Sequence, residues 1–194
     1  MNANATRQQI VAAADQLFYQ NGFAHTSFAD IAAAVQLSRG NFYYHFKSKD
    51  EILDAVIDLR LANTSRMLDA WAAEGATPKD RIRSFIHILL MNRAKIVLYG
   101  CPVGTLCIEL AKLEHVAQDR ASSIFALFRD WLAEQFALMG RKADARQLAM
   151  HVLMHSQGVA TMANAFRDEA FIRSEVAQIC AWLDDIKSKR RRKA

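Results

Sequence analysis

The stretch LSRGNFYYHFKSKDE, from Leu37 to Glu51, interleaves aromatic and basic side chains at an unusual density. If residues 39–46 form a helix, Phe42 and Phe46 lie four positions apart and can share one buried face. The two tyrosines and the histidine between them then project elsewhere, and large exposed aromatic side chains are unfavourable unless a partner covers them. Tyrosine and lysine can donate to phosphate oxygens, while arginine and asparagine can reach base edges. The alternative is that the tyrosines pack against another helix of the same chain.

Helix start and stop signals around this stretch predict a helix-turn-helix over about residues 27–46. An amphipathic pattern over about residues 5–21 precedes it and ends at an Asn-Gly pair, where glycine can take the left-handed cap. Ser27 has an acid three residues later, as in a capping box, and Ser38 can cap a second short helix after a tight turn. A third capping serine then opens a long helix over about residues 49–73.

The composition predicts an all-α protein. Of its 194 residues 52% are hydrophobic and 23% charged, and only two prolines and seven glycines interrupt the chain. The pattern of apolar positions predicts about nine helices. The net charge is +5, but the last eight residues, KSKRRRKA, carry six positive charges, so the remainder sums to 5 − 6 = −1. A nucleic-acid site must therefore be local, and the basic tail is expected to be a solvated end.

The sequence gives no sign of a membrane protein, a cofactor or a metal. No apolar run is expected to reach the ~18 residues of a membrane span, and the first residues lack the apolar core of a signal peptide. Three cysteines without paired spacing fit a reducing compartment, so we expect a cytoplasmic protein. His151 and His155 have a spacing that can clamp zinc, but no carboxylate or cysteine stands near them in sequence. A pocket or interface role fits these histidines better.

Residues 22–56, GFAHTSFADIAAAVQLSRGNFYYHFKSKDEILDAV, resemble the N-terminal DNA-binding domain of the TetR family of bacterial repressors. The likeness covers the first third of the chain, and the rest agrees with the family only in length and helical character. One departure is Gln36, where the family usually has glycine in the turn. The shared positions are Gly22 and the aromatic after it, Thr26, Ile31-Ala32, Leu37-Ser38, Gly40, the run from Phe42 to Phe46, and Ser48-Lys49.

The resemblance implies that residues 1–64 form a DNA-binding head and residues 65–194 an effector-binding and dimerisation domain. It implies that the head binds palindromic double-stranded DNA. Ser27 would contact phosphate, three residues of the second short helix would face base edges, and the aromatic residues after them would hold the sugar-phosphate backbone. The implied DNA contacts are Ser27, Arg39, Gly40, Asn41, Tyr43, Tyr44, His45, Lys47 and Lys49, with the two lysines on phosphate.

Three further helices are expected over about residues 79–99, 104–113 and 117–139. The apolar face of the last is wider than one core contact requires, so it can line a cavity as well as fill a core. An unknown small-molecule effector could bind there. The candidate pocket residues are Phe85, Leu89, Asn92, Phe128, Trp131 and His155.

Two final helices with heptad-like stripes suggest a helix-pair interface over about residues 144–187. The alternative is that the stripes pack the two helices within one chain. In the TetR family this pair forms the homodimer, which favours dimerisation. The stripe positions are Leu148, Val152, His155, Val159, Met162 and Phe166, then Ile172, Val176, Ile179, Leu183 and Ile186.

The segment GCPVGTLCIEL, from Gly100 to Leu110, places Cys101 between the end of one helix and the start of the next. The helix dipole there can lower the pKa of a thiol. The segment is similar to a Gly-Cys-x-x-Gly-x-Leu-x-x-Glu signature in a TetR branch that includes electrophile- and redox-responsive repressors, although Thr105 and Cys107 depart from it. Cys101 is therefore either an effector sensor or a small residue packed in a tight turn.

Together these features predict a DNA-binding transcriptional regulator, a repressor released by an effector. The sequence contains no nucleophile elbow, Gly-rich phosphate loop or paired acids, so we expect no enzyme. Two alternatives stay open, namely an enzyme whose site is assembled across the C-terminal helices and a helical adaptor. An adaptor would leave the tyrosine-histidine cluster unexplained.

Overall fold

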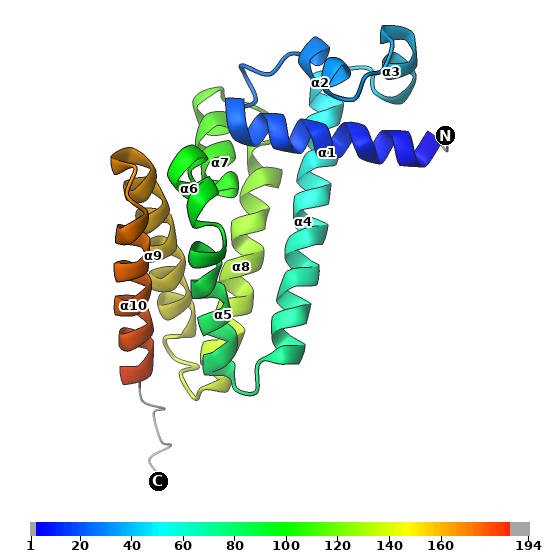
Figure 1. Ribbon diagram of the computed structural model, residues 1–194. Coiled ribbons are helices and arrows are strands. Elements are labelled where there is room, and N and C mark those ends of the chain that lie inside the picture. The colour runs from blue at the N-terminus through cyan, green and yellow to red at the C-terminus, as the bar shows by residue number, and fades with distance from the viewer. Residues whose placement is uncertain (1–2, 187–194) are drawn as a thin grey trace. The chain divides into compact units, whose positions relative to one another are not determined.

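The computed structural model describes residues 3–186, and within that range the chain is all-α, without strands (Figure 1). This confirms the predicted fold class. The helices are α1 (Ala3–Asn21), α2 (Phe28–Ala34), α3 (Arg39–His45), α4 (Lys49–Glu74), α5 (Pro78–Met91), α6 (Arg93–Tyr99), α7 (Pro102–Lys112), α8 (Gln118–Leu138), α9 (Ala145–Phe166) and α10 (Glu169–Asp185).

The contacts within the chain divide it into two compact units. Unit 1 comprises residues 1–64 and 102–124, and unit 2 comprises residues 65–101 and 125–194. Both α4 and α8 therefore begin in unit 1 and end in unit 2. The predicted division of function between residues 1–64 and 65–194 stays a prediction, because a compact unit is not by itself a functional domain.

The core of unit 1 is built around α1, α2, α3 and the first half of α4. Phe42 and Phe46 are fully buried in it, as the spacing of the two residues predicted. They pack among aliphatic side chains from the neighbouring helices, which fixes α3 on its apolar side. The fully buried aliphatic residues of this core include Ile10, Ile31, Ile52, Leu53 and Ile57.

The turn between α2 and α3 contains a strained residue. Gln36 has a φ of 55°, in the left-handed region that favours glycine. Its N–H donates to Ala33 O at 3.1 Å, and Leu37 N donates to Ala32 O at 3.2 Å. This pair of bonds is the Schellman motif, which requires a left-handed residue where Gln36 stands. The turn therefore keeps the geometry implied by the resemblance, although a glutamine occupies the position of the usual glycine.

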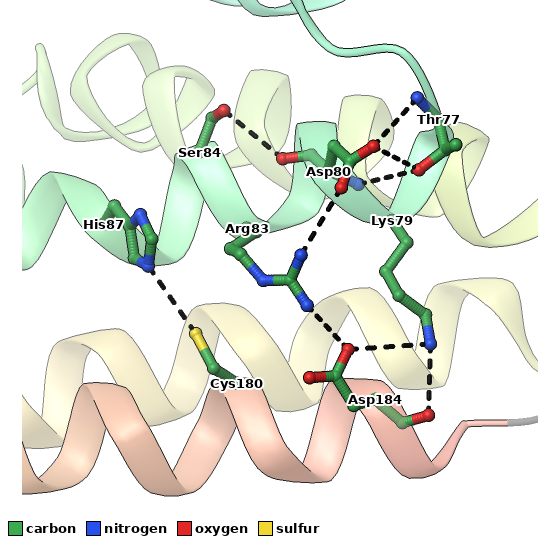
Figure 2. Close-up of polar contacts among 8 residues, drawn as sticks. All are labelled: Thr77, Lys79, Asp80, Arg83, Ser84, His87, Cys180 and Asp184. Atoms are coloured by element: carbon green, nitrogen blue, oxygen red, sulfur yellow. Dashed lines mark hydrogen bonds and ion pairs between the residues drawn. The ribbon is translucent and has the colours of Figure 1, made fainter.

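In unit 2, α10 packs along α5 and α9, and α9 also contacts α6. Figure 2 shows the polar bonds between α5 and α10. Arg83 Nη2 lies 2.6 Å from Asp184 Oδ1 and Lys79 Nζ lies 3.7 Å from it, while Lys79 also donates to Asp184 O at 3.1 Å. These charged contacts hold the C-terminal end of α10 to the start of α5.

The single helix predicted over residues 79–99 is divided into α5 and α6 at Asn92. The side chain of Asn92 donates to Ile88 O at 3.0 Å, and its backbone N–H also donates to Ile88 O, at 3.1 Å. Asparagine side chains compete with the helical backbone in this way. The apolar pattern continues across the break, which is why periodicity alone did not reveal it.

The stretch Arg93–Lys112 is long and apolar enough to cross a membrane by length and composition alone. In the structure it is not one helix. Gly100, with a φ of 77°, ends α6, and Pro102 begins α7. A span needs ~20 residues of continuous helix, so this stretch does not have the form of a span.

Candidate nucleic-acid interface

The surface of α3 exposes aromatic side chains next to polar and basic ones. Tyr44 is 72% exposed and Tyr43 is 49% exposed, whereas Phe42 of α3 and Phe46, the extended residue that follows the helix, are buried. The ring of Tyr44 meets the ring of His45 edge to face at 5.1 Å. The tyrosines of this short segment thus face outward to a large extent, whereas its two phenylalanines are covered by the chain.

Tyr43 is held in place but not covered. Its ring packs on Phe28 of α2, with centroids 4.9 Å apart and planes tilted by 32°. Its carbonyl accepts from Lys47 Nζ at 2.5 Å, which satisfies a group at the C-terminal end of α3. The packing alternative considered for the tyrosines therefore applies in part to Tyr43, through α2, and not to Tyr44.

The hydroxyl of Ser27 caps the start of α2. Its Oγ donates to Asp30 Oδ2 at 2.7 Å and accepts from Asp30 N at 3.1 Å, which with Ser27 N to Oδ2 at 2.8 Å completes a capping box. These bonds lower the pKa of Asp30, chiefly through the Ser27 side chain. The capping contribution is thus present at neutral pH and is lost as acid protonates Asp30. A phosphate contact would require the Ser27 hydroxyl to turn away from Asp30.

Lys49 also has an internal role that the sequence did not indicate. Its Nζ donates to Phe23 O at 2.9 Å and lies 4.2 Å from the centre of the Phe23 ring. An ammonium has three donors, so a phosphate contact remains available. Replacing Lys49 would nevertheless disturb the loop before α2 as well as any DNA contact.

Gly40 has no structural reason to be glycine. A Cβ built on it meets nothing within 4 Å, and its backbone φ is not in the left-handed region. Glycine within a helix costs ~1 kcal/mol relative to alanine. A glycine kept at this cost on the exposed side of α3 fits a site where a partner approaches the backbone closely.

The other predicted contacts lie on or beside the same helix. Asn41 is exposed, and its N–H donates to Ser38 Oγ at 3.4 Å, so Ser38 caps α3 as predicted. Arg39 is the first residue of α3, but the structure describes only its backbone and not its side chain. The sequence did not indicate that Arg7 lies near this site. Its guanidinium lies 4.6 Å above the Phe46 ring and adds a cation near the end of α3.

Two family models match segments of this chain. Residues 10–56 match the family model described as bacterial regulatory proteins of the tetR family. Residues 78–178 match the model of the LmrA/YxaF-like transcriptional regulator C-terminal domain. The chain belongs to the TetR family. It is a DNA-binding transcriptional regulator with a helix-turn-helix, and its relatives are regulators rather than enzymes.

Individual TetR-family relatives agree with this assignment. An uncharacterized HTH-type transcriptional regulator from the lacX 3′ region of Lactococcus lactis is 30% identical over 156 residues, 79% of this chain and 80% of that protein. The regulator TtgR of Pseudomonas putida is 45% identical over 99 residues, 48% of this chain and 47% of its own length. A TetR transcriptional regulator from Legionella pneumophila has the same fold, with a TM-score of 0.80 and 24% identity over 95% of this chain and 98% of that one.

The predicted effector-pocket residues of this TetR-family protein occupy three different settings in unit 2. Phe85, Leu89 and Phe128 are buried, and the rings of Phe85 and Phe128 meet edge to face at 5.3 Å. Trp131 is half-buried and its ring lies 5.9 Å from that of Trp71. Asn92 is exposed at the α5–α6 break. His155 pairs with an acid, since its Nε2 lies 3.3 Å from Glu175 Oε2.

An open groove of about 470 Å³ in unit 2 contains none of these six residues. It runs between α10 and the junction of α5 with α6. Cys180 lines it, 3.8 Å from His87 Nε2, and burial raises the pKa of the Cys180 thiol, so the thiolate is disfavoured. The lining residues are His87, Leu90, Arg93, Arg173, Val176, Ala177 and Cys180.

The histidines considered for zinc have separate partners. His155 pairs with Glu175, and the ring of His151 packs on Trp182 at 4.6 Å. Among the described residues, no group of three or more potential metal ligands comes together.

The predicted dimer stripe is largely buried within the single chain. Six of its positions are buried where α9 and α10 pack within unit 2, so they are covered by the chain itself and not by a partner chain. These positions are Val152, Val159, Ile172, Val176, Ile179 and Leu183. Met162 and Phe166 of the predicted stripe are exposed instead, and they continue a row on α9 that has Gly158 at its centre. This exposed α9 row consists of Met150, Met154, Gly158, Met162 and Phe166, and its four large members are between 41% and 76% exposed.

We predict that Gly40→Ala stabilises the protein but weakens DNA binding. The free energy of unfolding should rise by ~0.5–1 kcal/mol, because alanine is the better helix former and no atom obstructs its methyl group. Affinity for a specific operator should fall on the order of tenfold, because the methyl group blocks close approach of a base or phosphate.

Denaturant unfolding and fluorescence anisotropy with labelled operator measure the two effects. Gln16→Ala, an exposed position of α1, is the control, since it improves helix propensity without touching α3. Unchanged operator affinity in Gly40→Ala would show that α3 makes no close contact at this position.

Proposed function

We propose that the protein is a repressor that binds a palindromic double-stranded operator as a homodimer and is released by a small-molecule or electrophile effector. The observation that best supports DNA binding is the surface at α3, where Tyr44 is largely exposed although Phe42 and Phe46 are buried. Resemblance to a family of bacterial repressors supports repression. A regulator of bacterial genes acts where the DNA lies, so we expect the protein in the cytoplasm.

We assign different tasks to the residues around α3. Arg39 and Asn41 belong to the first turn of α3, the part of a recognition helix that usually contacts base edges. Tyr43, Tyr44 and His45 continue along the helix toward the sugar-phosphate backbone. Lys47, exposed just beyond α3, is a phosphate ligand.

Selection of bound duplexes from a random pool, followed by binding titrations at several salt concentrations, tests this function. A palindromic site should emerge, with half-sites one helical turn (~34–36 Å) or a related distance apart. Lys47→Ala should weaken binding to all sequences similarly and reduce the slope of log K against log salt by ~0.9, because one phosphate contact is lost.

Lys112→Ala, which removes the same charge from the last turn of α7, should leave that slope unchanged. Failure of the wild type to select any sequence would overturn the proposed function. A Lys47→Ala effect confined to some operator variants would instead assign this lysine to base reading.

The exposed α9 row is the surface we propose for the homodimer. It is continuous along four turns of α9, and methionine and phenylalanine are enriched at the cores of protein interfaces. Residues spaced by four form the ridge that commonly packs into the groove of a facing helix. A Cβ built on Gly158 would meet nothing within 4 Å. This glycine therefore leaves room for the backbone of a partner helix in the middle of the row.

We predict that Met154→Glu converts the dimer to a monomer at micromolar concentration. A two-fold interface places both copies of the substitution in one patch, so two carboxylates would be desolvated near each other. Sedimentation velocity measures the mass, and Leu138→Glu, at an exposed apolar position of α8, should leave the dimer intact. A wild-type monomer at this concentration would refute the dimer itself, whereas a dimeric Met154→Glu protein would place the interface elsewhere.

Cys101 stays a proposed sensor for an electrophile. It is a partly buried thiol between the end of α6 and the first residue of α7, where added volume would disturb the start of that helix. N-ethylmaleimide should release operator DNA from the wild type and not from Cys101→Ser, as measured by anisotropy. Equal release from both proteins, or an adduct found by mass spectrometry only on Cys107 or Cys180, would make Cys101 a packing residue.

A further inference from the structure

One carboxylate of α7 binds two successive backbone N–H groups in the loop between α1 and α2. Phe23 N donates to Glu109 Oε2 and Ala24 N donates to Glu109 Oε1, each at 2.8 Å. All three residues belong to unit 1, although Glu109 follows the loop by more than 80 positions. Hydrogen bonds to an ionised acceptor are about twice as strong as neutral ones, so this contact holds the loop firmly.

The carboxylate lies close to Gly22, where a side chain would crowd it. Gly22 has a φ of 87°, and a Cβ placed there would lie 3.0 Å from Glu109 Oε1. The glycine that ends α1 and the glutamate that ends the Gly-Cys motif of the sequence are therefore two parts of one contact. No function described above accounts for this glutamate.

Phe23 of this loop is held by contacts from several helices. Its carbonyl accepts from Lys49 Nζ at 2.9 Å, and the same ammonium lies 4.2 Å above its ring. The ring meets Phe18 of α1 at 5.3 Å and His115, which follows α7, at 5.2 Å. Helices α1, α4 and α7 are thus joined at a single residue of the loop.

The loop determines where α2 begins. The hydroxyl of Thr26, a fully buried residue, donates to Gly22 O at 2.7 Å, and the next residue, Ser27, caps α2. From there the Schellman turn at Gln36 leads directly to α3. Functional side chains must be held within ~0.5 Å of their working positions, so the loop that anchors α2 also limits where α3 can lie.

We propose that Glu109 is a positioning residue for DNA binding: by fastening Phe23 and Ala24 it holds α2 and α3 in the arrangement that reads the operator. This inference rests on the proposed DNA-binding function and adds a residue of α7 to it. Glu109 touches no DNA in this role. It acts through the loop, and a displacement of α7 would reach the DNA-reading helix through these two bonds.

The sign of the expected effect separates positioning from simple electrostatics. Removing a negative charge from a DNA-binding protein should by itself strengthen its attraction to DNA. If Glu109 positions α3, Glu109→Ala should instead lose about tenfold or more in affinity for the selected operator, while its affinity for a scrambled duplex stays the same or rises. Glu109→Gln, which keeps one acceptor oxygen, should lie between wild type and Glu109→Ala.

Arg120→Ala is the matched control for a general loss of stability. Arg120 belongs to unit 1, and its ion pairs are with Asp54 and Asp58 of α4 rather than with the loop. All proteins are compared by anisotropy with operator and with scrambled DNA, well below their melting temperatures. Hydrogen exchange followed by mass spectrometry reports on residues 22–26 and on α2 and α3.

The proposal expects faster exchange from the loop through α3 in Glu109→Ala, and near-normal exchange and operator affinity in Arg120→Ala. Operator affinity that falls equally in both variants, in proportion to their melting temperatures, would make Glu109 a merely structural residue. Unchanged operator affinity in Glu109→Ala would also overturn the inference. Absence of specific binding by the wild type would instead refute the proposed function on which the inference rests.

Discussion

The burial of Phe42 and Phe46 is the constraint on which the DNA-reading surface depends. An isolated helix of seven residues is unstable in water, because nucleating it costs more than its few hydrogen bonds return. Here Phe42 within α3 and Phe46, the extended residue directly after it, are both fully buried in the core of unit 1 and hold the short helix there. Once they are buried, the geometry of the helix leaves Tyr44 and much of Tyr43 outside. Exposure of the tyrosines thus follows from the burial of the phenylalanines on either side of them.

A second constraint acts where backbone groups would otherwise lack partners. The loop after α1 cannot use a helical ladder, so its N–H groups are bound by Glu109 and the carbonyl of Phe23 by Lys49. Opposite charges on two helices therefore fasten the same loop residue from both its donor and its acceptor sides. The short helices beyond the loop begin with side-chain caps from Ser27 and Ser38. Their placement rests on these local bonds as much as on apolar burial.

Local features of the structure could be predicted from the sequence, and long-range pairings could not. The caps at Ser27 and Ser38, the buried face of Phe42 and Phe46 and the all-α class all follow from signals within a few residues. The break at Asn92 was missed because the apolar pattern runs through it. The contact of Glu109 with Phe23 joins residues 86 positions apart, and no local pattern encodes such a partner. The DNA-contacting roles themselves stay predictions, since side-chain exposure is a necessary condition for them and not a sufficient one.

The last two helices show what periodicity can and cannot decide. A stripe at steps of three and four states that one face of a helix is buried, but it does not state by which partner. On α9 the stripe through Val152 and Val159 is buried by the chain itself. The row through Met150, Met154 and Met162 has an equally regular spacing and stays exposed. A helix with apolar residues on two faces needs two partners, and one chain supplies only the first. The second, exposed face is therefore the one we propose for a second copy of the chain.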